Sequence, residues 1–285
     1  MPALSFVDET YDPNITETYY LSIQVCLNGL SFSVTDPIAG KYIVLREYNL
    51  DNSLPVDDIY DRIADIADKD DFLQEKFKKV NIIWTSRKFT LIPSALFDKD
   101  NLRFYFEFHH QLEELDELHY RFIPEIEAYS VFTVPNHVAT TFTRKFPNPV
   151  FFHQSVPLVR DIFQHHLPGE GDQVVSLNIS DDFIDIMITD DETLIFYNTF
   201  TCKHPRDILY FVLYMYDQFN LDRKYTPLLV SGNIITRSEF YHLLQAYIGS
   251  IKIRKIKEER IYSYTFEKQV LHRFTNLFFL ENCEL

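Results

Sequence analysis

Glycine, cysteine and long apolar runs are scarce in this chain of 285 residues. With 6 Gly and 13 Pro, the sequence has little material for long flexible linkers. No apolar run approaches the roughly 20 residues that a helix needs to cross a bilayer, so we expect no membrane span. The N-terminal stretch lacks the basic and apolar segments of a signal peptide. These absences predict a cytoplasmic protein.

Cysteine and positive charge are limited in ways that exclude further classes. Cys26, Cys202 and Cys283 have no metal-site spacing and form no even disulfide set. Lys and Arg number 27 against 42 Asp and Glu, which gives a formal net charge of −15. Because proteins bind phosphate backbones and anionic lipids through Lys and Arg, this charge argues against nucleic acid and membrane surfaces as partners.

The densest basic stretch, "IKIRKIKEERIYSY", contains Lys252, Arg254 and Lys255. A charged edge strand is the first interpretation, since lysine protects the edge of a sheet from unwanted pairing. The alternative is a docking site for an acidic partner or for another subunit. Nucleic-acid binding would also need this stretch.

The sequence does contain the material for a core, and it contains a repeat. Hydrophobic residues make up 46% of the chain, with 26 Phe and 18 Tyr. In "LSIQVCLNGLSFSVT", residues 21–35, apolar and polar residues alternate on both sides of Asn28-Gly29, a dipeptide that favours a tight hairpin turn. In "VVSLNISDDFIDIMIT", residues 174–189, the same alternation surrounds Asp181-Asp182. The sequence therefore predicts two similar hairpins.

Similar elements follow each hairpin, in the order strand, helix, strand, helix, strand. After the first hairpin we expect a strand from Lys41, a helix from Pro55, a strand over 79–86, a short helix over 93–97 and a strand over 102–109. After the second we expect a strand over 193–200, a helix from Pro205, a strand over 227–233, a helix opened by a capping box at 236–239 and a strand over 251–256. Hairpins followed by helical crossovers imply a mixed sheet covered by helices.

The segment between the two sets of elements predicts the domain boundary. It contains strands and then helices near 136–145 and 155–166. "LPGEGD" at 167–172 is the clearest cluster of residues that break helices and strands. We therefore expect one subdomain over 1–150, a second over 151–285, and a linker near 167–172.

A duplicated unit of this order resembles the actin-like ATPase fold, which is of the ribonuclease H-like kind. Sugar kinases, heat-shock chaperone ATPases and the actin relatives of pilus assembly and cell division share that fold. Over nearly its whole length the chain is similar to the DUF3822 family, bacterial proteins of unknown function that are assigned to it. The resemblance implies an α/β protein with two mixed sheets flanked by helices.

The resemblance also implies a nucleotide site, and the residues of this chain depart from its pattern. In active members each hairpin carries Asp-x-Gly: the glycine lets the backbone approach the phosphates, and the aspartates arrange Mg²⁺ and the attacking water. Aligned on the turns, the first Asp and Gly correspond to Val25 and Leu27, and the second pair corresponds to Asn178 and Ser180. Neither hairpin then supplies the required carboxylate.

A shift of one residue does not restore the pattern. It places Gln24 or Cys26 at the first Asp, and neither is a carboxylate. Asp181, Asp182 and Asp185 are close to the second position, but a one-residue slip exchanges the two faces of a strand. The adenosine-loop Gly-Gly of the fold corresponds to Gly232-Asn233, so half of it is retained. The candidate nucleotide-site residues are Asn28, Gly29, Asn178, Ser180, Asp181, Asp182, Ser231, Gly232 and Asn233.

Two functional hypotheses follow from this pattern. In the first, the chain is a non-catalytic binding or scaffold protein with a degenerate nucleotide site, which acts through a protein partner or as a homodimer. It then has no catalytic residue, no metal ligand and no cofactor. In the alternative, it is an ATPase or kinase-like protein that binds Mg²⁺-ATP through a non-standard carboxylate, Asp181 or Asp182. Mg²⁺-dependent nucleotide binding that is lost in Asp182→Ala would favour the alternative.

Overall fold

The computed structural model describes residues 1–51, 53–164, 173–235, 238–254, 261–263, 265–266 and 271–280. The chain divides into two compact units. The first unit contains residues 1–160 and the described parts of 257–268 and 276–285, and the second contains the described parts of 161–256 and 269–275. The expected linker over 167–172 lies outside the described residues, and the subdomain limits 1–150 and 151–285 stay a prediction.

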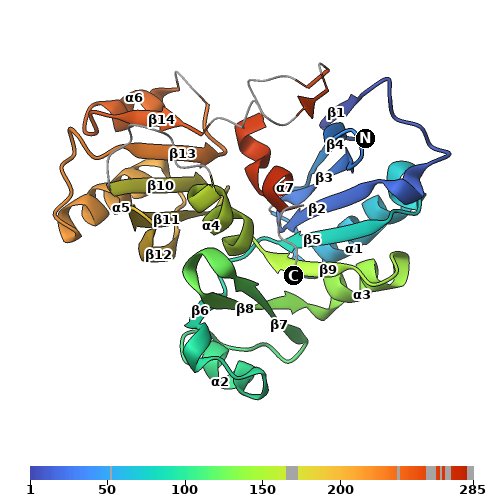
Figure 1. The fold of residues 1–285 in the computed structure, drawn as a ribbon, viewed down its shortest axis with the longest axis horizontal. Coiled ribbons are helices and arrows are strands. Elements are labelled where there is room, and N and C mark those ends of the chain that lie inside the picture. The colour runs from blue at the N-terminus through green and yellow to red at the C-terminus, as the bar shows by residue number, and fades with distance from the viewer. Residues whose placement is uncertain are drawn as a thin grey trace. The chain divides into compact units, whose positions relative to one another are not determined.

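A mixed sheet forms the centre of the first unit (Figure 1). Its strand order is β1-β4-β3-β2-β5-β9, and β15 also pairs with β4. Strands β2, β3 and β4 are antiparallel neighbours, whereas β5 and β9 are added in parallel. The strands are β1 (Leu4–Val7), β2 (Tyr20–Cys26), β3 (Gly29–Asp36), β4 (Lys41–Asn49), β5 (Lys79–Trp84), β9 (Val150–His153) and β15 (Ile261–Tyr262). The crossover helices α1 (Val56–Lys69) and α3 (Asn136–Lys145) lie side by side.

A second, smaller sheet is inserted in the first unit between β5 and α3. It has the order β6-β8-β7 and is entirely antiparallel. Its strands are β6 (Phe89–Pro93), β7 (Asp116–Ile123) and β8 (Ala128–Pro135). Helix α2 (Leu102–Glu107) and the 3-10 turns η3 (Ser94–Leu96) and η4 (Lys99–Asn101) connect β6 to β7. The last helix and strand of the first repeat are therefore α3 and β9, not the segments expected over 93–97 and 102–109.

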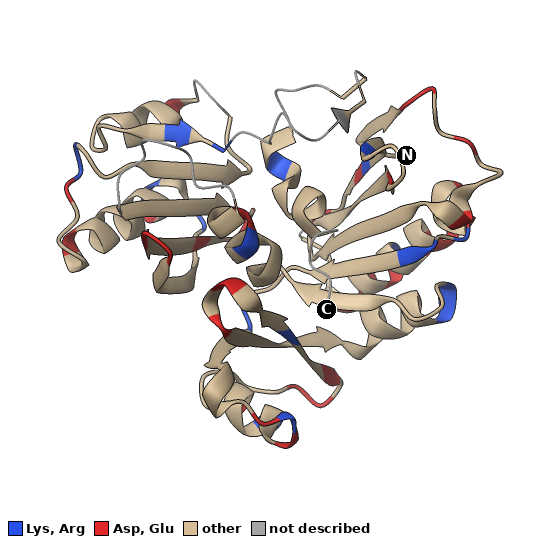
Figure 2. Ribbon diagram, in the orientation of Figure 1, with Lys and Arg blue, Asp and Glu red and all other residues tan. Residues whose placement is uncertain are grey.

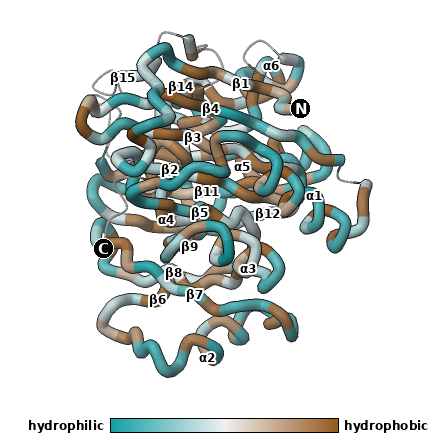
Figure 3. Tube along the Cα trace, turned by 90° about the vertical axis from the view of Figure 1, so that its right-hand side faces the viewer, coloured by the Kyte–Doolittle hydropathy of each residue, from teal (hydrophilic) through white to brown (hydrophobic). Residues whose placement is uncertain are grey.

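The strand expected over 102–109 is wrong, because residues 102–107 form α2. Phe104 and Phe108 alternate with polar residues, which predicts a half-buried strand. In the structure both rings face solvent, at 68% and 74% exposure, and Phe106 alone is buried. Arg103 and Glu107, one helical turn apart, form an ion pair of 2.9 Å between Nη2 and Oε1. Figure 3 shows the resulting mixture of hydrophobic and hydrophilic residues along α2 and its flanking loops.

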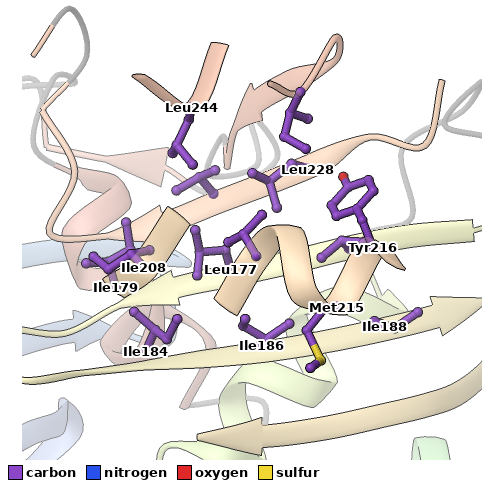
Figure 4. Packing of buried hydrophobic residues seen from close by; sticks show 14 of the residues in the cluster. Leu177, Ile179, Ile184, Ile186, Ile188, Ile208, Met215, Tyr216, Leu228 and Leu244 are labelled. Atoms are coloured by element: carbon purple, nitrogen blue, oxygen red, sulfur yellow. The ribbon is translucent and has the colours of Figure 1, made fainter. Parts of the chain in front are cut away.

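The second unit contains a five-stranded sheet of the order β12-β11-β10-β13-β14. Its strands are β10 (Gln173–Ile179), β11 (Phe183–Asp190), β12 (Thr193–Thr201), β13 (Leu228–Gly232) and β14 (Ile251–Ile253). Helices α5 (Pro205–Gln218) and α6 (Glu239–Gln245) follow β12 and β13 in the chain. One face of the sheet packs on them: Leu177 and Ile186 meet Val212 and Tyr216 of α5 and Leu244 of α6 (Figure 4). The buried residues of this cluster are apolar apart from the Cys202 thiol and the Tyr216 hydroxyl, which donates to the carbonyl of Thr226.

Helix α6 begins at Glu239, the first residue of the helix that the sequence predicts. Its N-cap is Ser238, whose Oγ accepts from the backbone N–H of Tyr241 at 3.1 Å. The capping box was expected from Thr236, which with Arg237 lies outside the described residues.

The remaining helical elements are α4 (Ser155–Gln164), α7 (Thr275–Leu280), η1 (Thr16–Thr18), η2 (Phe72–Gln74), η5 (Pro124–Ile126) and η6 (Leu271–Phe274). Among the described helices, none is long and apolar enough to span a bilayer.

The two main sheets have the same topology. The order β4-β3-β2-β5-β9 in the first unit repeats as β12-β11-β10-β13-β14 in the second, with three antiparallel strands followed by two parallel ones. The first sheet adds β1 and β15 at the β4 edge. The expected α/β fold with two mixed sheets and a sequence repeat is thus confirmed.

Candidate functional site

In the second unit, two of the polar residues predicted for the nucleotide site, Asn178 and Ser231, lie near the ends of β10 and β13. Asn178 of β10 pairs in register with Ser231 of β13 and with Asp185 of β11, so the three side chains share one face of the sheet. This face is opposite to the apolar cluster that packs on α5 and α6. Ser231 Oγ donates to Asn178 Oδ1 at 3.0 Å, and Asn178 Nδ2 donates to Asp185 Oδ2 at 3.2 Å.

Asp185 is the buried carboxylate of this site, with no exposed surface. Its second oxygen, Oδ1, accepts from the hydroxyl of Tyr197 on β12 at 3.0 Å. Burial, followed by the adjacent Asp185 charge, raises the pKa of Tyr197 well above its usual value, so this hydroxyl remains a donor at neutral pH. Both carboxylate oxygens and both polar atoms of the Asn178 amide therefore have partners within the protein.

The sequence could have identified Asp185. Asn178 and Asp185 are equally far from the centre of the turn at 181–182, and residues related in this way on a hairpin face the same side. The sequence argument reached Asp185 only through a slipped register, which would have reversed the faces. No slip is needed, because the natural register already places the carboxylate beside Asn178.

Ser180, Asp181 and Asp182 form the hairpin turn, and the two aspartates are exposed. The Ser180 N–H donates to the carbonyl of Phe183, which closes the turn. Asp181 Oδ1 accepts from Asn233 Nδ2 at 2.5 Å. The structure thus brings Asp181 and Asn233 together at the surface, separate from the buried Asn178–Asp185 pair.

Gly232 is explained by the way the chain leaves β13. Its φ angle is +82°, and a Cβ atom there would lie 2.2 Å from the carbonyl oxygen of Ile179. The N–H of Asn233 donates to the same Ile179 oxygen at 2.7 Å. Glycine is therefore required by close backbone packing inside this unit, independently of any ligand.

Asn28 and Gly29 belong to the first unit, at the turn between β2 and β3. Asn28 is partly buried, and its carbonyl accepts from the N–H of Leu50 at 2.7 Å. Gly29 has a φ of +154°, and a Cβ atom there would lie 2.0 Å from the Tyr48 carbonyl oxygen. This glycine too is required by the crossing of two backbones.

The sheet registers give a direct correspondence between the two hairpins. The N–H of Thr85 donates to the Val25 carbonyl just as the N–H of Asn233 donates to the Ile179 carbonyl. Val25 therefore corresponds to Ile179, and Gln24 corresponds to Asn178. Alignment on the turns placed the first Asp at Val25, whose side chain is fully buried. The structural equivalent is the amide Gln24, one residue earlier.

The corresponding face of the first sheet is polar but carries no charge at these positions. Gln24 pairs in register with Ser31 of β3, and Ser22 pairs with Ser33 and with Asn81 of β5. Three buried side-chain atoms of this set have no hydrogen-bond partner in the described part of the chain: Gln24 Oε1, Ser33 Oγ and Asn81 Oδ1. No described group of three His, Cys, Asp or Glu residues is arranged to hold a metal ion, in either unit.

The basic stretch of the second unit is only partly described. Arg254, at 4% exposure, donates through Nη2 to Asp161 Oδ1 at 2.7 Å and to the Asp161 carbonyl at 2.9 Å. Its charge is therefore used inside the unit, and it is not part of an exposed patch. Lys252 lies in β14 at intermediate exposure, and Lys255 lies outside the described residues.

Solved structures with the same fold support this description. A Bacteroides thetaiotaomicron protein with an actin-like ATPase fold and unknown function is 23% identical, covers 96% of this chain and 100% of its own, and superposes with a TM-score of 0.80. The PilM–PilN type IV pilus biogenesis complex matches at 11% identity, 93% and 99% coverage and a TM-score of 0.57. The ethanolamine utilization protein EutJ from Carboxydothermus hydrogenoformans matches at 9% identity, 96% and 92% coverage and 0.50.

These likenesses establish the fold, and the sequence establishes the family. No curated protein matches the chain. Residues 8–251 match the family described as "Protein of unknown function (DUF3822)". As this match covers most of the sequence, the chain belongs to the DUF3822 family and has the actin-like ATPase fold.

Proposed function

We propose that this protein is a non-catalytic binding or scaffold protein on an actin-like ATPase fold whose nucleotide site is degenerate. The observation that carries the proposal is the closed network of Asn178, Asp185, Ser231 and Tyr197. A hydrated Mg²⁺ ion needs carboxylate oxygens that can accept from its water ligands. Each oxygen of Asp185 already accepts from a protein donor, and the carboxylate is fully buried.

The first hairpin adds to this argument. Phosphoryl transfer in this fold depends on charge at both hairpins, because Mg²⁺ and the attacking water must be held together. Gln24 and Ser31 occupy the positions that correspond to Asn178 and Asp185, and neither is charged. The retained Gly29 and Gly232 have structural reasons of their own. The residues that remain from the nucleotide pattern are thus accounted for without a nucleotide.

A protein partner fits the fold and the charge of the chain. PilM, in its complex with PilN, has a similar fold over nearly its whole length. By analogy, we infer that this chain acts by holding another protein, with a second copy of itself as the competing arrangement. Its net charge of −15 opposes nucleic acid as the partner. Cys202 is a free thiol, which suits the reducing cytoplasm that we propose as its location.

Thermal unfolding with and without Mg²⁺-ATP or Mg²⁺-ADP tests the proposal. A ligand that binds only the folded chain adds about 2.7 kcal/mol of stability at a hundredfold excess over its Kd. We expect no change in the unfolding midpoint with either nucleotide.

The variants Asp182→Ala and Glu192→Ala test the alternative, an ATPase that uses an exposed carboxylate. Both side chains are exposed, Asp182 in the β10–β11 turn and Glu192 in the β11–β12 turn. A nucleotide shift of several degrees in the wild type that disappears in Asp182→Ala and persists in Glu192→Ala would overturn the scaffold proposal. Light scattering of the purified chain, in turn, distinguishes a homodimer from a protein that awaits a different partner.

A further inference from the structure

Strand β12 is a long edge strand with few of the features that protect such edges. Among the described strands of the second unit it is the outermost on its side of the sheet, with β11 as its neighbour. Its nine residues, Thr193–Thr201, include no charged residue and no proline, and the strand is tan in Figure 2. Native edge strands are usually short, or carry a lysine or a proline that prevents pairing with another chain. The opposite edge of this sheet, β14, has three residues and includes Lys252.

The equivalent strand of the first unit has an additional neighbour that β12 lacks among the described strands. Strand β4 has the same place in the sheet order as β12, and β1 (Leu4–Val7) pairs with it in the antiparallel direction. Burial follows this difference: residues 42–45 of β4 are buried, whereas every residue of β12 is exposed or partly exposed. The fold thus accepts a further antiparallel strand at this edge of the sheet.

A second copy of the chain has a strand that fits this edge, namely its own β12. A two-fold axis perpendicular to the sheet makes two identical edge strands antiparallel and keeps the helices of both copies on one face. With the axis at Tyr197, the middle of the strand, the whole of one β12 lies along the whole of the other. The register with β11 shifts once, near the start of β12, so residues 196–201 form the regular part of the edge.

The charges that flank β12 are complementary in this arrangement. Asp190, Asp191 and Glu192 precede the strand, whereas Lys203 and Arg206 follow it. Antiparallel pairing brings the acidic end of each strand beside the basic end of the other, whereas parallel pairing would bring like charges together. Asp191, Glu192, Lys203 and Arg206 are exposed, and none has an ion pair within the described part of the chain. The flanking charges therefore favour an antiparallel second copy.

Helix α5 continues this surface beside β12. Phe211 of α5 stacks on Phe200 of β12, with ring centroids 4.4 Å apart. The Tyr210 ring lies 5.3 Å from that of Phe211 and stacks on Tyr214 at 6.1 Å, and these two tyrosines are 62% and 46% exposed. The exposed rings thus lie on the β12 side of α5, where α5 of the second copy would approach. Aromatic side chains are enriched where proteins meet.

We propose that two copies of this chain associate by antiparallel pairing of their β12 strands, which joins the two five-stranded sheets into one continuous sheet. Backbone hydrogen bonds between the strands supply the affinity, and the flanking charges select the direction of pairing. Such pairing rests on the proposed function in one respect, since it takes the chain to act through contacts with protein. It gives the second copy a definite surface and leaves the other surfaces of the chain for a different protein.

Charge reversal at the two ends of β12, followed by analytical ultracentrifugation, tests the pairing. One variant is Asp191→Lys/Glu192→Lys, and the other is Lys203→Glu/Arg206→Glu. We expect the wild type to sediment as a dimer and each variant to have a dimer Kd raised by about tenfold or more, because like charges then face each other at both ends. An equimolar mixture of the two variants should dimerise again, because opposite charges face each other in the mixed pair.

Restoration in the mixture separates loss of contact from loss of folding, since a misfolded variant is not rescued by another. Lys224→Glu, an exposed charge reversal between α5 and β13, is the control and should leave the dimer unchanged. A monomeric wild type would overturn the inference and leave the β12 edge to a strand of a different protein. A dimer that both charge reversals leave intact would overturn it too, and so would a mixture that stays monomeric.

Hydrogen exchange at low and high chain concentration locates the contact surface. We expect residues 193–201 to become better protected as the dimer forms, because their amides enter new hydrogen bonds. Strand β14, at the opposite edge of the same sheet, should not change. A dimer in which protection rises at β14, or in which residues 193–201 do not change, would place the contact elsewhere and overturn the inference.

The two proposals can fail separately. A nucleotide-dependent rise in stability that depends on Asp182 would remove the scaffold function and leave the oligomeric state of the chain as measured. Conversely, a monomeric chain would remove the β12 pairing and leave the nucleotide result unchanged.

Discussion

The two main sheets have one topology but different chemistry on equivalent strands. Ser22 and Gln24 of β2 correspond to Ser176 and Asn178 of β10, so each unit has a serine two residues before an amide. Opposite the amide, the first unit has a serine and the second has Asp185. In both units the alternate residues of the same strands are apolar and fully buried, or nearly so. One face of each sheet thus forms the apolar core, and the other face differs between the two units.

This difference affects which buried polar groups have hydrogen-bond partners within the protein. In the second unit the amide and the carboxylate bind each other and their neighbours. In the first unit Gln24 Oε1, Ser33 Oγ and Asn81 Oδ1 have no partner among the described residues. Buried polar atoms of this kind are usually satisfied by ordered water. The difference is confined to the amide and the residue opposite it, because Ser176 Oγ and Thr189 Oγ1 on the same face of the second sheet are also buried without a partner among the described residues.

The largest effect is expected at a position where the two units differ outright. Gly232 corresponds to Trp84, since each is the last register partner on its strand. Gly232→Ala should lower the free energy of unfolding by about 3 kcal/mol or more, because the new Cβ meets the Ile179 carbonyl and φ is positive. Gly40→Ala is the control: φ is +61° but no atom lies within 4 Å, so a loss of about 1 kcal/mol is expected. Chemical denaturation gives both values, and equal losses would contradict the packing argument.

The second prediction concerns the hydrogen-bond network around Asn178, which only the second unit has among the described residues. Asn178→Leu removes the donor to Asp185 and the acceptor for Ser231, which should cost about 3 kcal/mol. Gln24→Leu removes an amide whose Oε1 has no partner, and its effect should stay within about 1 kcal/mol. Denaturant midpoints of the two variants check this difference. A larger loss of stability in Gln24→Leu than in Asn178→Leu would contradict the argument that the hydrogen bonds of Asn178 make it the more stabilising of the two amides.

The third prediction concerns acid sensitivity, which should begin in the first unit. Burial lowers the pKa of His153 to about 3, and that of His119 to about 4, from an ordinary value near 6.5. Below 6.5 the unfolded chain binds protons that the folded chain does not. Stability therefore falls with falling pH, by up to about 1.4 kcal/mol per pH unit for each residue, until its folded pKa is reached.

Hydrogen exchange at pH 7 and pH 5 would locate this effect. We expect protection of β5, β8 and β9 to fall before that of β10 and β11. In the second unit His204 and His242 are exposed, whereas His272 is buried and its Nε2 is hydrogen-bonded to the carbonyl of Ile234 at 2.9 Å. His153→Gln should reduce the pH dependence in the first unit. Simultaneous loss of protection in both units would show that the acid response is not local.

The smallest effect is expected at Asp182, in the turn between β10 and β11 that the sequence analysis singled out. Asp182 is exposed, and only its backbone carbonyl has a recorded bond, from the N–H of Cys202. Asp182→Ala should change the free energy of unfolding by less than about 0.5 kcal/mol. Glu192→Ala, in the next turn, is the matched control. A larger loss in Asp182→Ala than in its control would reveal a role for this side chain that the contacts do not explain.

Strict alternation made most of the fold predictable. Strands β2, β3, β10 and β11 lie where the period of two places them, and the helix that starts at Pro205 begins there because Asp207 caps it from within. The inserted sheet of β6, β7 and β8 was missed as a unit, because its strands are close in sequence to a helix with strand-like alternation. Tertiary packing of Phe106 decides that helix, and no local pattern reports it.

The positions of these candidate residues along the strands could be predicted from the sequence, but their contacts could not. Asn178, Ser231 and Gly232 lie around the hairpin as expected, but their contacts follow from register, which a one-residue error in alignment conceals.

The path of the chain has a consequence for how this protein is made. Strand β15 and residues 276–280 of α7 belong to the first unit, although the second unit is translated before them, and Tyr42 donates its hydroxyl hydrogen to the carbonyl of Phe278. Residues 271–275 complete the second unit. Neither unit can therefore be complete before residues 271–280 have been synthesised. The two units must therefore complete their folding together, although most of their strands are synthesised much earlier.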